Sequence, residues 1–249
     1  MNARAQGGDR FLNGKVLARQ PADGFRSGLD AVMLAASVPA AAGDAVLELG
    51  SGAGVAALCL AARVARCSVY GLERDAALVE LANANAALNT MADRVRALEG
   101  DALAPPKPLR RDFDHVFSNP PFHGDEGRAS PVAGRAAATR DEGRLGDWLR
   151  MGLKRTASGG TFTAILRADR LGDALAALPH RGTLVLPLWP KADVQAKRAI
   201  VQVRKAARHP LGFLPGLVLH DADGRYTPEA DAILRDGAAL TLTPRQPPA

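Results

Sequence analysis

The chain has 249 residues, of which 47% are hydrophobic and only 4% aromatic, and its formal net charge is +6 with a pI of about 9.8. This length is ordinary for one α/β domain, and the lack of any apolar run approaching ~20 residues argues against a transmembrane span. The basic balance favours polyanionic partners, although an arginine-rich composition produces the same charge without any function.

The first residues, Met1 to Arg10, are polar and contain glycine, and they lack the apolar stretch of a signal peptide. We therefore expect residues 1–23 to form a flexible arm and the protein to be cytoplasmic. Cys59 and Cys67 have no metal-ligand spacing with the histidines. Both are predicted to be buried, reduced thiols, and no metal site is expected.

Apolar periodicity predicts alternating helices and strands along the chain. In chain order these are a helix at 29–37, a strand at 45–49, a helix at 55–66, a strand at 68–72, a helix at 75–88, and strands at 95–98 and 114–118. Further on we predict a helix at 145–155 closed by 158–160, a strand at 161–166, a helix at 171–178, and a late antiparallel pair at 183–188 and 200–203.

This alternation is typical of a parallel sheet with right-handed crossovers. The predicted fold is therefore an α/β, doubly wound sheet that is mostly parallel, with an antiparallel strand near the C terminus. We assign it to a single domain over residues 24–244, followed by a proline-rich tail at 245–249. Residues 123–144 are predicted to form a mobile loop.

The turn after the strand at 45–49 reads Glu48-Leu49-Gly50-Ser51-Gly52-Ala53-Gly54. Its glycines let the backbone turn sharply and let a ligand approach without meeting a Cβ. The N terminus of the following helix supplies N–H donors and a positive dipole, which suit a carboxylate or a phosphate. Val55 occupies the last place of a G-x-G-x-x-G fingerprint, so the turn does not match a dinucleotide site.

Two more acidic residues follow neighbouring strands. Glu73 ends the strand at 68–72, where a carboxylate can accept hydrogen bonds from ribose hydroxyls. Asp101 follows the strand at 95–98 and can accept from the exocyclic amine of an adenine. One such acid alone is more often a solvated turn residue. With Glu48, three acids at three successive strand ends beside a glycine turn predict a cofactor site.

The stretch Asn119-Pro120-Pro121-Phe122 follows the buried strand at 114–118, at the edge of an open α/β sheet where ligands bind. Its prolines fix the backbone and remove two N–H donors. The result is a stiff loop with an amide oxygen at one end and an aromatic face at the other. Such a loop can accept hydrogen bonds from an amino group and stack on a flat ring. Alone, it would also fit a tight surface turn.

The G-x-G-x-G turn preceded by an acid resembles motif I of the S-adenosylmethionine-dependent methyltransferases. With Asn-Pro-Pro-Phe, the chain resembles their class I, amino-acceptor group, whose fold is Rossmann-like. More narrowly, the segments Gly24-Phe25-Arg26-Ser27-Gly28-Leu29-Asp30 and Gly224-Arg225-Tyr226-Thr227 are similar to those of the bacterial tRNA1(Val) adenine-37 N6-methyltransferases, which carry a small methyltransferase domain.

The resemblance implies contacts with S-adenosylmethionine from the glycine turn, the strand-end acids and the acceptor loop, namely Glu48, Gly50, Gly52, Gly54, Glu73, Asp101 and Asn119. It further implies that Asn119 and Pro120 hold a target amine and that Phe122, in place of the commoner tyrosine, stacks on the base. The implied reaction is methylation of the N6 amine of a tRNA adenine, at position 37 of the anticodon loop.

Other interpretations remain open. A first alternative is that the chain methylates a different acceptor, either the N2 amine of an rRNA guanine or a protein glutamine amide. A non-catalytic RNA-binding module with a vestigial cofactor fold is an alternative, and a dinucleotide oxidoreductase is disfavoured by Val55. The oligomeric state is open between monomer and homodimer. Two groups of basic residues either grip tRNA phosphates or form solvated faces: Lys191, Lys197, Arg198, Arg204, Lys205 and Arg208, and Arg128, Arg135, Arg140 and Arg144.

Overall fold

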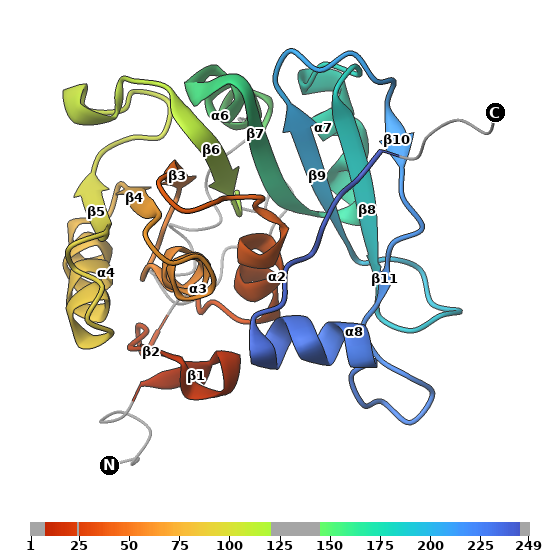
Figure 1. Ribbon diagram of the computed structural model, residues 1–249, viewed down its shortest axis with the longest axis horizontal. Helices are drawn as coiled ribbons and strands as arrows, with labels where there is room; N and C mark the ends of the chain where they lie inside the picture. Colours follow the sequence, from red (N-terminus) through yellow and green to blue (C-terminus); the bar gives the residue numbers. More distant parts are fainter. Residues whose placement is uncertain (1–7, 24, 121–144, 245–249) are drawn as a thin grey trace.

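A nine-stranded sheet runs through the computed structural model, which describes residues 8–23, 25–120 and 145–244 (Figure 1). Its strands are β3 (Ala45–Leu49), β4 (Ser68–Glu73), β5 (Val95–Glu99), β6 (Phe113–Ser118), β7 (Thr156–Arg167), β8 (Thr183–Trp189), β9 (Arg198–Arg204), β10 (Gly212–Phe213) and β11 (Leu217–Val218). The helices are α2 (Leu29–Ser37), α3 (Val55–Arg63), α4 (Ala76–Leu88), α6 (Leu145–Arg155), α7 (Leu171–Ala177) and α8 (Pro228–Asp231), with short turns of helix at Leu12–Gly14, Lys107–Leu109, Ala168–Arg170 and Ala232–Asp236.

The strand order is β10-β8-β9-β7-β6-β3-β4-β5, and β11 also pairs with β8. β3 to β7 are mutually parallel, whereas β9 runs antiparallel to both of its neighbours, β7 and β8. The predicted α/β doubly wound sheet, mostly parallel with a late antiparallel strand, is confirmed. α2 and β3 match their predicted bounds, and α3 ends three residues earlier than predicted, at Arg63.

The predicted helix stop at 158–160 is wrong, because these residues lie inside β7. β7 begins directly after α6, and its register with β6 shifts between Phe113 and His115. Gly159 has φ +81°, and a Cβ on Gly160 would lie 2.1 Å from the carbonyl oxygen of Asp114. The two glycines therefore form a bulge in a strand, not the end of a helix.

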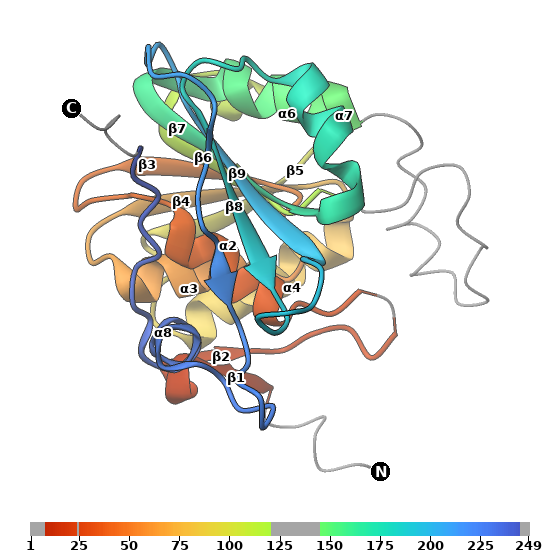
Figure 2. The same cartoon turned by 90° about the vertical axis from the view of Figure 1, so that its right-hand side faces the viewer.

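Helices cover both faces of the sheet (Figure 2). On one face, α2, α3 and α4 pack against side chains such as Val46, Val69 and Phe117. On the other face, α6 and α7 cover side chains such as Leu47 and Phe162. Alternate residues of β3 thus face opposite cores, and the sheet is buried on both sides, as a parallel sheet requires.

The N-terminal residues from Gly8 onward belong to the fold, which corrects the expected flexible arm at 1–23. β1 (Asp9–Phe11) and β2 (Val16–Ala18) form a hairpin whose residues Leu12, Val16 and Ala18 are buried. Two asparagines dock the hairpin, Asn85 in α4 and Asn89 directly after it. Asn89 Oδ1 accepts from Leu17 N at 2.9 Å, and Asn85 Oδ1 accepts from Arg19 N at 2.9 Å. The sequence around Met1 to Arg10 is polar, so its periodicity did not reveal this packing.

Within the described ranges, no helix is long and apolar enough to cross a membrane. Cys59 and Cys67 are free and buried, as predicted.

Candidate functional site

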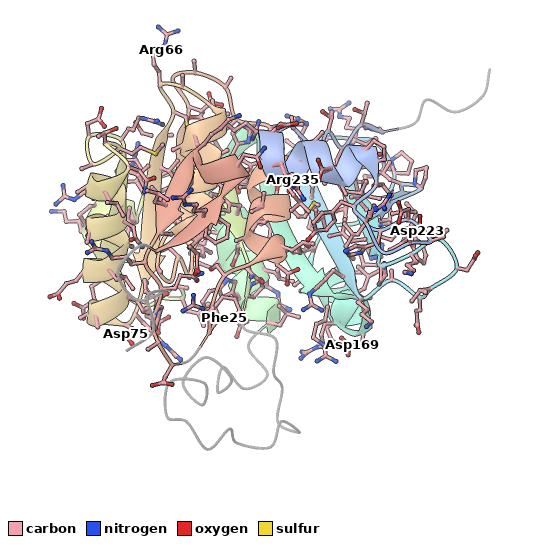
Figure 3. All side chains as sticks on the ribbon, turned by 90° about the horizontal axis from the view of Figure 1, so that it is seen from below. Phe25, Arg66, Asp75, Asp169, Asp223 and Arg235 are labelled. Atoms are coloured by element: carbon pink, nitrogen blue, oxygen red, sulfur yellow. The ribbon has the colours of Figure 1, made fainter. Side chains whose placement is uncertain are left out.

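The carboxyl ends of β3, β4 and β6 meet at one edge of the sheet, which we call the carboxyl edge. Leu49 pairs in register with Leu72 on one side and with Ser118 on the other. The residues that follow, Gly50, Glu73 and Asn119, are therefore brought together. In Figure 3, Asp75 and Asp169, which follow the carboxyl ends of β4 and β7, lie on the same side of the molecule, and Arg66 lies on the opposite side.

The glycine turn adopts a conformation that other residues rarely reach. Gly50, Gly52 and Gly54 have φ values of +71°, +52° and +81°, in the left-handed region that favours glycine. Gly50 N donates to Leu72 O at 2.8 Å, which ties the start of the turn to the end of β4. A Cβ on Gly52 would meet nothing within 4 Å. The turn is thus open to a ligand at Gly52.

Trp148 on α6 is a site residue that the sequence did not reveal. Its Nε1 donates to Ser118 Oγ at 2.7 Å, and Ser118 Oγ donates to Leu49 O at 2.9 Å. A Cβ on Gly50 would lie 3.0 Å from Cζ2 of Trp148. One indole therefore contacts the cofactor turn and the strand that carries the acceptor loop. The sequence showed only that Trp148 lies in the predicted helix at 145–155.

Glu48 is only 3% exposed, and its Oε2 accepts from Ala57 N at 3.1 Å, in the first turn of α3. Burial raises the pKa of Glu48 well above its ordinary value of 4.5, and the nearby charge of Glu73 raises it further, while the bond from Ala57 opposes the rise. The carboxyl group thus braces the helix behind the glycine turn. Its direct contact with a cofactor stays a prediction.

The carboxylate of Glu73 is fixed by three backbone donors at the end of β4. Oε2 accepts from Gly52 N at 2.9 Å, and Oε1 accepts from Arg74 N at 2.9 Å and Asp75 N at 3.1 Å. A carboxylate has about four acceptor sites, so the group is held in place and can still accept from a hydroxyl.

Asp101 follows β5 on the same edge, since Gly100 N donates to Glu73 O at 2.9 Å. It is exposed, and its Oδ1 accepts from Leu103 N at 2.8 Å. The three predicted strand-end acids therefore lie along one edge, in the order in which their strands pair.

Asn119 and Pro120 leave the carboxyl end of β6. Pro120 is buried, and the buried Oδ1 of Asn119 has no hydrogen-bond partner among the residues that the structure describes. Such an orphan acceptor is uncommon in a folded protein and calls for an explanation, such as a ligand group that completes it. Pro121, Phe122 and the predicted loop at 123–144, with its four arginines, lie outside the described residues. In the part that the structure describes, no cluster of His, Cys, Asp and Glu could hold a metal ion.

The late basic residues do not form one group. Lys191, Lys197 and Arg198 lie at the carboxyl edge, where β8 ends and antiparallel β9 begins. The remaining three, Arg204, Lys205 and Arg208, lie at the end of β9 and beyond it, at the opposite edge. At the carboxyl edge Arg198 pairs with Asp30 at 2.9 Å. The sequence grouped all six because it did not show that β9 runs from one edge to the other.

Residues 27–140 match the family model of the methyltransferase small domain. Over 226 residues, the chain is 27% identical to the tRNA1(Val) (adenine(37)-N6)-methyltransferase of Dickeya chrysanthemi, covering 85% of this chain and 87% of that protein. Over 188 residues it is 30% identical to the enzyme of the same name from Actinobacillus pleuropneumoniae serotype 7, covering 73% and 77%.

Among solved structures, a predicted O-methyltransferase from Agrobacterium tumefaciens matches with a TM-score of 0.71 and 26% identity, covering 86% of this chain and 99% of that chain. A geranyl diphosphate methyltransferase in complex with S-adenosylmethionine matches in fold, with a TM-score of 0.51 and 14% identity, over 71% of this chain and 84% of that chain.

Proposed function

Since this chain belongs to the family of tRNA1(Val) (adenine(37)-N6)-methyltransferases and is a methyltransferase that uses S-adenosylmethionine, we propose that it methylates the exocyclic N6 amine of an adenine in tRNA, at position 37 of the anticodon loop. One observation carries the choice of an amine: the orphan Oδ1 of Asn119 is buried at the carboxyl edge, one residue beyond Ser118. An amino group of the substrate is the partner that this oxygen lacks.

The described residues fit the cofactor. The open turn at Gly52 and the N terminus of α3 suit its carboxylate. Glu73, already oriented by backbone donors, accepts from its ribose hydroxyls, and Asp101 accepts from its adenine amine. When bound, S-adenosylmethionine supplies a methyl group on a positively charged sulfur. The chain's own task is then to hold the acceptor nitrogen in line with that methyl group.

An adenine amine is a poor nucleophile because its lone pair is delocalised into the ring. Accepting its two protons at Asn119 Oδ1 and at the carbonyl oxygen of Pro120 favours a tetrahedral nitrogen whose lone pair points away from both oxygens. The same two dipoles stabilise the positive charge that develops on the nitrogen. The proton can leave after transfer, so no general base is required.

The acceptor oxygen is organised before the substrate arrives. Asn119 Oδ1 is buried and has no hydrogen-bond partner among the described residues, so an amine that reaches it supplies the partner it lacks. A hydroxyl acceptor would need a base to remove its proton, whereas an amine is held by hydrogen-bond acceptors, as Asn119 Oδ1 and the carbonyl oxygen of Pro120 are here. This favours an amine over the oxygen acceptor named for the Agrobacterium structure.

The test is to incubate the protein with labelled S-adenosylmethionine and total tRNA, digest the RNA, and identify the modified nucleoside. We expect N6-methyladenosine at position 37. Label in 2-methylguanosine or in a protein glutamine would overturn the proposed substrate. Asn119→Ala should abolish turnover while the calorimetric affinity for S-adenosylmethionine stays nearly unchanged, and retained turnover would refute the acceptor geometry.

A further inference from the structure

A group of basic side chains lies at the edge of the sheet opposite the methylation site. We call it the amino-edge basic cluster, and it consists of six residues from the end of α6, the start of β8, and the end of β9 with the segment after it: Lys154, Arg155, Arg181, Arg204, Lys205 and Arg208. Four of the six are exposed, and Arg155 and Lys205 are half-buried.

The segments that carry the cluster are bonded to one another. Arg204 Nη1 donates to Gly159 O at 2.8 Å, and Arg181 Nη1 donates to Arg208 O at 3.1 Å. Lys205 Nζ donates to Thr156 O at 2.5 Å. These acceptors are neutral carbonyl oxygens, so the bonds fix the side chains without neutralising their charge.

Four arginines at the carboxyl edge and on α6 form ion pairs instead. Arg198 pairs with Asp30 at 2.9 Å, Arg170 with Asp173 at 2.7 Å, and Arg150 with Asp147 at 2.9 Å. Arg167 also pairs with Asp169. None of the ion pairs found between described residues involves a member of the amino-edge basic cluster. Ion pairs therefore neutralise these four arginines, whereas no member of the amino-edge basic cluster is in an ion pair among the described residues.

Adjacent like charges repel one another, and charges closer than a Debye length of about 8 Å are incompletely screened. A protein that places six positive charges at one edge, three of them held by bonds to backbone carbonyls, gains from a polyanion that adds negative charge there. Phosphates of a nucleic-acid backbone match this requirement, because such contacts position an RNA without reading its sequence.

We propose that the amino-edge basic cluster binds the sugar–phosphate backbone of the RNA substrate at a distance from the methylated base. This inference rests on the proposed function. β9 has 7 residues, and a strand rises ~3.3 Å per residue, so the two edges are about 20–25 Å apart. A tRNA spans several times that length and can contact both edges. An isolated anticodon stem-loop reaches the methylation site but offers far less RNA for the cluster.

The experiment compares full-length tRNA with its anticodon stem-loop. The variant is Arg181→Gln/Arg208→Gln, which removes two exposed charges. The matched control is Arg10→Gln/Arg19→Gln, which removes two exposed charges from the N-terminal hairpin and the residue after it, neither of them in an ion pair among the described residues. Thermal unfolding should show that both variants fold as the wild type does, because all four side chains lie on the surface. S-adenosylmethionine affinity should also be unchanged in both.

For the cluster variant, we expect the KM for full-length tRNA to rise about tenfold, with kcat and the KM for the stem-loop unchanged. The slope of log K against log salt for tRNA binding should become shallower by about 1–2, as expected for the loss of two phosphate contacts. The control variant should leave all of these values unchanged.

Unchanged tRNA binding by the cluster variant would overturn the inference and point to another acidic partner. An equal loss with the stem-loop would also overturn it, because the cluster would then act through the site itself. If the wild type methylates no RNA, the proposed function fails by itself. The salt-dependent binding of tRNA then still tests the cluster, and loss of the difference between the two variants refutes it.

Discussion

Replacing Gly50 with alanine tests whether Trp148 couples the cofactor turn to the acceptor loop. Gly50 has φ +71°, and a new Cβ would lie 3.0 Å from Cζ2 of Trp148. An L-residue in the left-handed region costs about 1–2 kcal/mol. The indole must also shift, which weakens its bond to Ser118 and adds about 1 kcal/mol. We therefore expect Gly50→Ala to lower the free energy of unfolding by about 2–3 kcal/mol.

Gly52→Ala is the matched control. Gly52 has φ +52°, and its Cβ would meet nothing within 4 Å, so only the backbone strain of about 1–2 kcal/mol applies. A double-mutant cycle then isolates the indole. In a Trp148→Ala background, Gly50→Ala should cost about as much as Gly52→Ala, which leaves a coupling energy of about 1 kcal/mol between Gly50 and Trp148.

Urea unfolding gives the stabilities, and calorimetry gives the affinity for S-adenosylmethionine. Gly50→Ala and Gly52→Ala should both weaken cofactor binding, because both restrict the turn. Only Gly50→Ala should also lower kcat at saturating cofactor, since Ser118 precedes Asn119. Equal losses of stability for the two variants, together with a coupling energy of zero, would refute the coupling through Trp148.

Three further predictions test the surroundings of the site. Burial raises the pKa of Glu48, so the folded state holds the carboxyl proton of Glu48 more tightly than the unfolded state does. The stability gained in this way is present at low pH and is lost as the pH rises through the folded-state pKa. Glu48→Gln cannot ionise, so its free energy of unfolding in urea should match that of the wild type at about pH 4 and exceed it at about pH 8. A stability difference between the two proteins that does not change with pH would contradict this prediction. Glu73→Ala should raise the calorimetric Kd for S-adenosylmethionine at least tenfold, with an unchanged Kd removing its ribose role. Asn85→Ala deletes three bonds to Arg19 and Ala53 and should cost about 2–4 kcal/mol in urea unfolding, whereas a loss below about 1 kcal/mol would show that the hairpin is not docked through Asn85.

The sequence predicted those elements whose signals are local. The bounds of α2 and β3 agree with the structure because an apolar run ends at a glycine or just before a proline in each case. The predicted residues Gly50, Glu73, Asp101 and Asn119 share one edge because the carboxyl ends of neighbouring parallel strands must meet there. Strand order and direction were therefore sufficient to assemble the core of the candidate site.

The features that the sequence missed depend on contacts between distant segments. Trp148 reaches Ser118 across 30 positions of the chain, and Asn85 reaches Arg19 across 66. Neither contact has a periodic signal. Arg198 and Arg204 are close in sequence, yet they lie at opposite edges because β9 crosses the whole sheet. In an extended strand, neighbours in sequence separate faster than in a helix, so charge clusters read from strand segments are unreliable guides to surfaces.

The sheet ties Asn119, the proposed acceptor residue, to the glycine turn. In-line transfer requires Asn119 to stay at a fixed distance from the cofactor turn, and a misplacement of about 1 Å can cost about a hundredfold in rate. Here the register pairing of Leu49 with Ser118, the bond from Ser118 Oγ to Leu49 O, and the indole of Trp148 fix that distance through adjacent strands.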